Sequence, residues 1–587
     1  MQEIDHTANP FPGLRPFESN ETHLFFGRDG QSEELLRRLK RRRFLTVVGT
    51  SGSGKSSLVR AGLLPALQGG LMASAGSDWR IAILRPGSDP IGNLARALAS
   101  PAVLGSRDDT EASNLQAVLA ETTLRSSGLG LVELVSRART KLDSRGQPLF
   151  ADYENLLVVV DQFEELFRFK QLIEQENSNE DAAAFVRLLL EAVRQKAEKI
   201  YVVLTMRSDF LGDCSQFWEL PEAINDGQYL IPRMTRDERR EAISGPVAVG
   251  QGAISEPLVN QLLNDVGDNP DQLPILQHAL MRTWEYWTDH RHNGNPIDIP
   301  DYNAIGTMAE ALSRHADEAF AELSDSQKLI AERLFKGLTE KGADNREIRR
   351  PIEVEEICQL TSADEATVIS VIEVFRGEER SFLMPPPTDA LTGARVPLTR
   401  DSLIDISHES LIRNWERLKT WVDEESQSAR IYKRLAETAV LHRAGEEALL
   451  MDPALQVALD WREKNRPNAV WARRYHPEFE TAMSFLDQSL AARDAETQER
   501  QKRIKREATY KRARWILVVL GFAFVLSVAA LTFSYRQLAQ AKQEFTLAQD
   551  RLLEADKARA AAEHLADFAQ TKEHFANQSR MRLSNKG

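Results

Sequence analysis

The sequence predicts an α/β domain built on a parallel β-sheet, followed by a helical domain, a winged-helix domain, one membrane-spanning helix and a helical tail. Three observations support this prediction. Short apolar runs alternate with helical patterns between about residues 44 and 230, which is typical of parallel strands joined by crossover helices. A glycine-rich turn of the form GxxxxGK-Ser/Thr joins the first apolar run to a helical pattern. Near the C-terminus, 21 consecutive residues carry no charge.

Length and composition indicate a multidomain protein. Its 587 residues exceed what one hydrophobic core organises, because domains typically hold roughly 100–200 residues. There are 74 Lys and Arg residues against 87 Asp and Glu residues, and the net charge of −13 disfavours generic binding to nucleic acid. Cys214 and Cys358 lie in unrelated segments, so the sequence predicts neither a disulfide framework nor a zinc site. We therefore expect most of the chain in a reducing compartment.

Five apolar runs are expected to form the sheet. Their nearly continuous apolar character predicts that the sheet is covered on both faces. The runs are FLTVVG (44–49), WRIAILRP (79–86), NLLVVVD (155–161), KIYVVLTMR (199–207) and a short YLI (229–231).

The chain turns helical after the sheet. Residues 236–325 show helical patterns without further strand runs and predict a helical domain. Residues 326–425 give helical stretches, then two short apolar runs around a turn rich in Pro and Gly, then an amphipathic helix, which is an order that suits a winged helix. The apolar residues of that last helix recur at steps of three and four and are expected in the core: Leu411, Trp415, Leu418 and Val422.

The strongest functional signal is the glycine-rich turn after the first strand. Backbone N–H groups of such a turn point at phosphate oxygens, and the start of the following helix adds partial positive charge. Lys55 would bridge the β- and γ-phosphates, and Ser56 would ligate Mg²⁺. The sequence thus predicts an α/β P-loop NTPase domain whose phosphate-binding residues are Gly49, Thr50, Ser51, Gly52, Ser53, Gly54, Lys55, Ser56 and Ser57.

Acidic residues follow the third apolar run. Asp161 ends that run, where a carboxylate is needed to hold Mg²⁺ beside the phosphates. Either Glu164 or Glu165 could orient or deprotonate the attacking water, and the sequence leaves the choice open with a slight preference for Glu165. The alternative is that both glutamates only solvate the start of the next helix.

Arg207 ends the fourth run, at the same predicted sheet edge as Lys55 and Asp161. A guanidinium presents fixed donors to phosphate oxygens, so Arg207 is a candidate sensor of the γ-phosphate. A salt bridge with a nearby acid is the alternative role.

Residues 515–535 predict a membrane-spanning helix. At about 1.5 Å per residue they match a hydrocarbon core of about 30 Å, and Trp515 and Tyr535 lie at the ends, where aromatic rings favour the interface. Only Arg536 and Lys542 follow closely, whereas seven basic residues precede: Lys502, Arg503, Lys505, Arg506, Lys511, Arg512 and Arg514. The positive-inside rule then places residues 1 to about 514 in the cytoplasm and the tail outside the inner (plasma) membrane.

These patterns divide the chain into seven segments. They are an N-terminal segment with the FFGRD motif (1–30), the P-loop nucleotide-binding domain (31–235), the helical domain (236–325), the winged-helix domain (326–425), a charged helical linker (426–514), the membrane-spanning helix (515–535) and a helical or coiled-coil tail (536–587).

The motifs together resemble the STAND class of P-loop NTPases, and specifically the novel STAND family of bacterial signalling proteins. The resemblance covers about residues 9–425. It is carried by NPFPGLRPF followed by FFGRD, and by GTSGSGKSS, VVVDQFEEL, VVLTMRSDF, LPILQHAL and ISHESLIRNW. It implies that three domains clamp ADP in a closed resting state, and that an ATP-bound state opens and oligomerises.

The resemblance also implies further contacts with the nucleotide. Gly27 and Arg28 match the family's glycine–arginine pair beside the base and sugar. Pro274 matches the proline that packs on adenine, although Gln272 stands where the family has glycine. His408 is similar to the histidine that touches the β-phosphate of ADP from the winged helix, and the glutamate after it would replace the family's acidic residue.

The expected function is a membrane-anchored switch that binds ATP or ADP with Mg²⁺ and hydrolyses ATP slowly, in bacterial stress or antiphage signalling. The expected partners are further copies of the chain in the ATP state and a protein trigger or effector that the sequence does not identify. Two alternatives are a membrane scaffold with a structural nucleotide and a winged-helix regulator that binds DNA. The second is disfavoured because residues 326–425 are not a strongly basic block.

Overall fold

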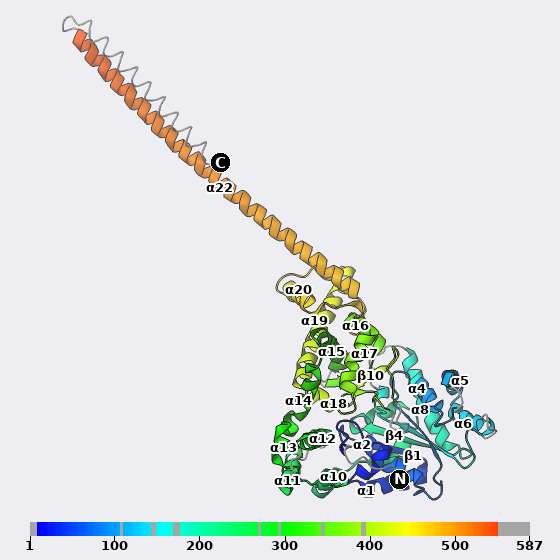
Figure 1. Ribbon diagram of the computed structural model, residues 1–587. Helices are drawn as coiled ribbons and strands as arrows, with labels where there is room; N and C mark the ends of the chain where they lie inside the picture. Colours follow the sequence, from blue (N-terminus) through cyan, green and yellow to red (C-terminus); the bar gives the residue numbers. More distant parts are fainter. Residues whose placement is uncertain are drawn as a thin grey trace. The chain divides into compact units, whose positions relative to one another are not determined.

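The computed structural model describes residues 9–105, 110–142, 148–167, 176–267, 272–290, 295–341, 347–388 and 395–549 (Figure 1). The chain forms two compact units. The first comprises residues 1–444 and 458–482 and contains the sheet, the helical domain and the winged helix. The second comprises residues 445–457 and 483–587 and contains most of the longest helix.

A five-stranded parallel sheet forms the α/β domain. Its strand order is β2-β3-β4-β1-β5, and each neighbouring pair is parallel. All five apolar runs form strands, as the sequence predicts. The strands are β1 (Phe44–Gly49), β2 (Trp79–Leu84), β3 (Asn155–Val160), β4 (Ile200–Arg207) and β5 (Gln228–Leu230).

Helices cover both faces of this sheet, which is why its strands lack a polar face. Leu45 and Val47 share a buried cluster with α1 and with the helical run that follows the P-loop. Phe44 and Val48 share another with α4, α6 and α8. The helices of this domain are α1 (Asp29–Arg42), α2 (Lys55–Ser57) continued by the π-helical η2 (Leu58–Leu63) and by α3 (Leu64–Gln68), α4 (Pro90–Leu98), α5 (Thr110–Ser126), α6 (Gly130–Thr140), α8 (Glu176–Arg194) and α9 (Leu220–Gly227).

The carboxyl ends of the parallel strands meet at one edge of the sheet. Gly49, the last residue of β1, is paired in register with Arg207, the last residue of β4. Asp161 directly follows β3, and Arg85 directly follows β2. This edge therefore carries the start of the P-loop, a carboxylate and two guanidinium groups, and open parallel sheets bind their ligands at this edge.

The helical domain follows the sheet and begins at Arg236, where Thr235 caps the first helix. Its core comprises buried residues of all five helices, among them Ile243, Leu262 and Trp284. The helices are α10 (Arg236–Val249), α11 (Glu256–Val266), α12 (Leu273–Asp289), α13 (Ile299–Ala304) and α14 (Thr307–Ala321).

The next region has the element order of a winged helix. A helix, a strand, two helices and two further strands follow one another, and the three strands form an antiparallel sheet in the order β8-β10-β9. These elements are α15 (Asp325–Gly337), β8 (Ile352–Glu353), α16 (Val354–Thr361), α17 (Glu365–Arg376), β9 (Leu383–Met384) and β10 (Leu403–Ile406).

A hairpin between α15 and β8 was not expected. It consists of β6 (Thr339–Lys341) and β7 (Glu347–Arg349), which pair antiparallel. Its two strands are three residues long and mostly polar, so they lack the alternation of apolar and polar residues by which a strand is predicted.

The predicted amphipathic helix at the end of this region is broken in two. Trp415, with φ −84° and ψ 105°, separates α18 (Glu409–Asn414) from α19 (Glu416–Ala444). The predicted core stripe is confirmed, since Leu411, Trp415, Leu418 and Val422 are all at most 2% exposed. The boundary expected at residue 425 lies inside α19, because buried residues continue along that helix to Ala439.

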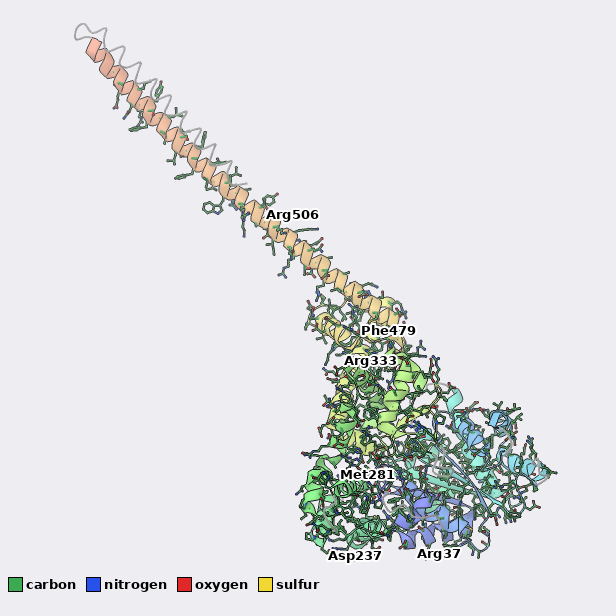
Figure 2. All side chains as sticks on the ribbon, in the orientation of Figure 1. Arg37, Asp237, Met281, Arg333, Phe479 and Arg506 are labelled. Carbon is green, nitrogen blue, oxygen red and sulfur yellow. The ribbon has the colours of Figure 1, made fainter. Side chains whose placement is uncertain are left out.

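The rest of the described chain is helical. Two short helices, α20 (Ala454–Asn465) and α21 (Ala469–Arg473), precede α22 (Phe479–Gln549), which contains residues 515–535. One helix of the described chain is long and apolar enough to cross a membrane, judged by length and composition alone. Figure 2 shows side chains projecting from α22 beyond Arg506, and those of residues 515–535 are exposed. Of the predicted helical tail, residues 550–587 lie outside the described residues.

Candidate nucleotide-binding site

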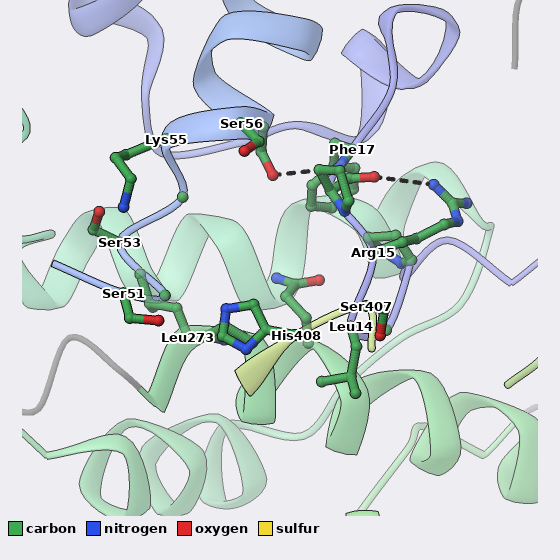
Figure 3. A pocket seen from close by; sticks show the side chains of 18 of the residues that line it. Leu14, Arg15, Phe17, Ser51, Ser53, Lys55, Ser56, Leu273, Ser407 and His408 are labelled. Atoms are coloured by element: carbon green, nitrogen blue, oxygen red, sulfur yellow. Dashed lines mark hydrogen bonds between the residues drawn. The ribbon is translucent and has the colours of Figure 1, made fainter. Parts of the chain in front are cut away.

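A pocket lies at the carboxyl edge of the sheet, within the first unit (Figure 3). Its walls come from the N-terminal segment, the P-loop, the helical domain and the winged helix. One lining residue from each part is Phe17, Lys55, Leu273 and His408. The relative position of the four parts therefore determines whether this pocket is closed.

The P-loop has a backbone conformation that only glycine adopts readily. Gly52 and Gly54 have φ values of 71° and 87°, and a Cβ on Gly49 would lie 2.6 Å from Ser53 Oγ. Helix begins at Lys55, so the N–H groups of the first turn are available to a phosphate. Of the predicted P-loop residues, 51–57 line the pocket, whereas Gly49 and Thr50 line a neighbouring cavity that shares Arg28 and Ser53 with it.

Lys55 is buried beneath the P-loop. Its Nζ donates hydrogen bonds to the carbonyl oxygens of Gly49 at 3.1 Å and Thr50 at 2.7 Å. Burial lowers the pKa of Lys55 below its usual value, and the carboxylates of Glu164, Asp161 and Glu409 oppose that shift. The ammonium group thus lies among acids at the sheet edge.

Ser56 and Asp161, the two predicted Mg²⁺ ligands, are in contact. Ser56 Oγ donates to Asp161 Oδ1 at 2.8 Å, and Thr205 Oγ1 donates to the same oxygen at 2.6 Å. Burial alone would raise the pKa of Asp161, but Arg60, Arg85 and these hydroxyls hold it below its usual range. An ionised carboxylate beside a serine hydroxyl at the start of the P-loop helix is a donor set that suits Mg²⁺.

The two glutamates after Asp161 have different surroundings. Glu164 lines the pocket, and its Oε2 accepts a hydrogen bond from the Arg207 N–H at 3.3 Å. Glu165 lies behind the wall, where its Oε2 accepts from the Gly87 N–H at 3.1 Å and burial raises its pKa to about 7. The geometry therefore favours Glu164 over Glu165 as the residue that faces a bound phosphate chain.

Arg207 reaches the pocket and is engaged by the winged helix. Its Nη1 lies 2.8 and 3.0 Å from the two carboxylate oxygens of Glu409, and its Nη2 lies 2.6 Å from Asp209. Glu409 is 4% exposed, and its Oε2 also accepts from Ser51 Oγ at 3.2 Å. The salt-bridge alternative for Arg207 is thus present in the structure, and the acid involved lies on the opposite wall of the pocket.

Arg85 and Arg349 also line the pocket and were not predicted. Asp405 Oδ2 lies 3.2 Å from Arg85 of the α/β domain and 2.9 Å from Arg349 of the β6–β7 hairpin. Arg349 Nη2 also donates to Gln162 Oε1 at 2.7 Å. Arg85 could have been found from the sequence, because it lies near the end of the predicted strand run 79–86 and therefore at the same sheet edge as Lys55 and Asp161. Nothing in the pattern pointed to Arg349, since its hairpin was not expected.

His408 precedes α18 and lines the pocket. Its Nδ1 accepts a hydrogen bond from the backbone N–H of Ser410 at 3.1 Å, so the ring proton of the neutral form is on Nε2. Burial lowers the pKa of His408 to about 3, and nearby cations add to the shift. The residue therefore offers one neutral N–H donor at neutral pH.

The FFGRD motif and the start of α12 form the apolar part of the pocket. Gly27 has φ 78°, and a Cβ there would lie 2.3 Å from the Glu238 carbonyl oxygen, so this glycine permits close approach to α10. Arg28 is buried and donates to the Ser53 carbonyl oxygen at 3.1 Å, which braces the P-loop. Pro274 lies in the first turn of α12. Apolar and ring side chains of this part of the lining are Phe25, Phe26, Met234, Leu273, Pro274 and Leu276.

Comparisons with known proteins place the chain in a family. The family model described as Novel STAND NTPase 1 matches residues 10–448. Among curated proteins no relative matches. Several solved structures show a distant likeness. The ORC1 protein of Aeropyrum pernix in complex with DNA has 13% identity and a TM-score of 0.32, with 68% of this chain and 94% of that chain covered. The ORC2 protein of the same organism, in ADPNP-ADP complexes, has 12% identity and a TM-score of 0.36, with 68% and 94% covered.

A third solved structure is domain III of the replication initiation protein DnaA from Thermotoga maritima. It has 15% identity and a TM-score of 0.28, with 47% of this chain and 88% of that chain covered. The family match over residues 10–448 includes the FFGRD motif, the P-loop, Asp161, Arg207, Pro274 and His408. The chain belongs to the novel STAND family of P-loop NTPases.

Proposed function

We propose that this protein is a membrane-anchored, ATP-dependent signalling switch. Its resting state is closed and holds ADP, and its ATP state is open and oligomeric. The observation that carries the proposal is the contact of Arg207 with Glu409, because it joins the nucleotide pocket directly to the winged helix.

A γ-phosphate and the winged helix would compete for the same donors. Glu409 takes hydrogen bonds from both Arg207 and Ser51, which belong to the sheet edge and the P-loop. A γ-phosphate held by Lys55 would offer these donors a more highly charged acceptor. ATP would therefore release Glu409 and with it the winged helix. Shifting such an equilibrium from 1:99 to 99:1 needs about 5.5 kcal/mol of differential affinity.

ADP would have the opposite effect. It leaves Arg207 with Glu409, and the Nε2–H of His408 is available to donate to a β-phosphate oxygen from the winged-helix side. The winged helix would then contribute to holding ADP. This arrangement supports a closed ADP state whose loss, rather than rapid turnover, is the signal.

The pocket contains what slow ATP hydrolysis requires. Ser56 and Asp161 would hold Mg²⁺, which would stabilise charge on the phosphate oxygens. Glu164 faces the pocket and can orient or deprotonate a water molecule. Arg207 is held by Glu409 in the closed form and reaches phosphate only after the winged helix moves, so hydrolysis is expected to be slow and regulatory.

Membrane anchoring through residues 515–535 is part of the proposal. Support comes from the absence of charge in this stretch, from its exposed apolar side chains and from the basic residues just before it. Residues up to about 514 would then be cytoplasmic. A role in bacterial stress or antiphage signalling is likewise proposed, on the family resemblance alone.

DNA binding by the winged helix is disfavoured. The helix that would enter the major groove is α17, and its only basic residue, Arg376, is fully buried. Glu365 is exposed on the same helix. A recognition helix normally presents basic or amide side chains to DNA.

The test compares oligomer size and bound nucleotide. The full-length protein in detergent is measured by light scattering with ADP, with ATP and without added nucleotide, and copurifying nucleotide is identified. We expect ADP in the purified protein and a larger particle with ATP.

In Lys55→Ala we expect nucleotide binding to be lost and the size to stay constant. The matched control is Lys141→Ala, because Lys141 is exposed and does not line the pocket. Equal size in all three states would contradict the switch, and a protein that binds nucleotide without changing size would favour the scaffold alternative.

A further inference from the structure

An N-terminal segment crosses the nucleotide pocket. Residues 9–21, here called the strap, extend from the helical domain to the helix after the P-loop. Figure 3 shows Leu14, Arg15 and Phe17 along one side of the pocket, with Ser51 and Lys55 along the other. The strap contains the NPFPGLRPF motif (9–17), to which the sequence assigned no role.

The first end of the strap is fixed to the helical domain. Asn9 Nδ2 donates to the Met281 carbonyl oxygen at 3.0 Å and to Glu285 Oε1 at 3.3 Å, both on α12. Phe11 is 3% exposed and belongs to the helical-domain core. Gly13 has φ 69°, and a Cβ there would lie 2.7 Å from Met281 Sδ, so the chain passes α12 too closely for a larger residue.

The middle of the strap is seated in a different core. Leu14 is 4% exposed and belongs to the buried cluster that contains Leu312 of α14 and Ile406 and Leu411 of the winged helix. Only Pro12 and Gly13 therefore separate Phe11, in the helical-domain core, from Leu14, in an apolar cluster shared with the winged helix.

The far end of the strap is fixed to the helix that follows the P-loop. The Phe17 N–H donates to Ser57 Oγ at 3.2 Å. Glu18 Oε1 lies 2.6 Å from Arg60, and Arg60 also lies 3.4 Å from Asp161, the predicted Mg²⁺ ligand. The strap thus contacts the P-loop helix directly and is linked to the acidic strand end through Arg60.

Arg15 gives the strap a fixed cation at the pocket. Its guanidinium makes a bidentate contact with Glu21, at 2.7 and 2.5 Å. Glu21 also accepts the Glu18 N–H at 2.8 Å, so the side chain that orients Arg15 is itself fixed by the backbone. Arg15 lines the pocket from this position.

We infer that the strap is a component of the nucleotide site, which covers bound nucleotide and sets its rate of exchange. Leu14 packs in the buried cluster that includes Ile406 and Leu411 of the winged helix. Movement of the winged helix therefore takes away the side chains that hold Leu14, and release of Leu14 from this cluster opens the pocket. The strap thereby couples the position of the winged helix to the escape of nucleotide. This inference rests on the proposed nucleotide binding. It adds a second link between the winged helix and the pocket, beside the Arg207–Glu409 pair.

A cover and a simple contact predict different kinetics. A cover hinders both entry and exit, so weakening it raises the association and dissociation rates together and changes the affinity little. A residue that only contacts the nucleotide changes dissociation alone. The ratio of the two rates therefore separates these roles.

The experiment measures fluorescent ADP in stopped flow with the full-length protein in detergent. We expect Leu14→Ala to raise both rates by about tenfold or more, because a truncated side chain leaves its apolar seat partly empty. Leu14→Met keeps the apolar volume and is expected to restore slow exchange. Glu33→Ala, an exposed change on α1, is the control and should leave both rates unchanged. Rates in Leu14→Ala within twofold of the wild type would overturn the inference, and so would a change in dissociation alone.

Hydrogen exchange of the wild type supplies a readout that needs no variant. Amides of residues 9–21 are expected to exchange more slowly with ADP than with ATP, and equal exchange in both states would contradict the coupling. If the wild type bound neither nucleotide, the proposed function itself would fail. If it bound both and Leu14→Ala behaved as the wild type, only the role of the strap would be lost.

Discussion

The guanidinium of Arg207 and the carboxylate of Glu409 face each other across the nucleotide pocket, with Nη1 2.8 and 3.0 Å from the two carboxylate oxygens. One residue ends a strand of the sheet and the other begins a helix of the winged helix. Because both are largely buried, removing one partner takes from the other an opposite charge at hydrogen-bond distance.

Removing Glu409 is expected to favour the ATP state. In Glu409→Ala, Arg207 Nη1 and Ser51 Oγ lose the carboxylate that competes with a γ-phosphate, so we expect ATP affinity to rise roughly tenfold, which is about 1.4 kcal/mol. Assembly should occur at correspondingly lower ATP concentration. Calorimetric titration and light scattering measure the two effects. Glu416→Ala is the control, since this side chain is 74% exposed on α19, and ATP affinity equal to that of the wild type in Glu409→Ala would exclude competition.

Replacing His408 is expected to weaken ADP retention. A hydrogen bond to a charged group contributes about 1.5–3 kcal/mol, so His408→Ala should raise the rate of ADP release about tenfold or more. The pKa of His408 is lowered to about 3, so its contribution should be constant between pH 5 and 8. A release rate that changed with an inflection near pH 6.5 only in the wild type would show that the histidine is not neutral in the complex.

The two glutamates can be separated by hydrolysis rates. Glu164 faces the pocket and Glu165 does not, so Glu164→Gln should slow ATP hydrolysis by roughly 100-fold, a typical loss for a general base. Glu165→Gln should retain hydrolysis within about threefold of the wild type. Single-turnover measurements separate hydrolysis from slow nucleotide exchange. The reverse result would return the role to Glu165.

Glu165 should instead affect how stability depends on pH. Burial raises its pKa from 4.5 to about 7, so the folded protein retains this proton over a range where the unfolded chain has lost it. Its stabilising contribution is complete below about pH 4.5 and is lost as the pH rises through 7. The melting temperature of the wild type relative to that of Glu165→Gln should therefore fall between pH 5 and 8. Glu33→Gln, which changes an exposed residue, should show no such trend.

Charges in the middle of residues 515–535 should prevent stable membrane insertion. Each arginine at the centre of a span costs about 2.5–3.5 kcal/mol, so Phe524→Arg combined with Leu526→Arg should shift the protein from the carbonate-resistant membrane fraction to the soluble fraction. Ile504→Arg, outside the apolar stretch, should leave it in the membrane fraction. A wild-type protein that is itself released by carbonate would rule out a spanning helix.

Local patterns were sufficient for the sheet and the phosphate end of the pocket. The P-loop and Asp161 follow apolar strands, and parallel strands bring their carboxyl ends to one edge, so their proximity is predictable from sequence. Sequence patterns could not distinguish Glu164 from Glu165, because adjacent residues at the start of a helix differ only in the direction in which their side chains point. Arg349, Asp405 and the strap were missed because their contacts join segments far apart in the chain, and no short-range periodicity records such contacts.

The uninterrupted length of α19 has a mechanical consequence. This helix begins eight positions after His408 and continues for 29 residues, about 43 Å at 1.5 Å per residue. A stiff rod of this length acts as a lever, so a tilt of about 10° at its first residue would carry its far end roughly 8 Å. In the proposed switch, the exchange of ADP for ATP would in this way become a displacement large enough to rearrange a surface remote from the nucleotide.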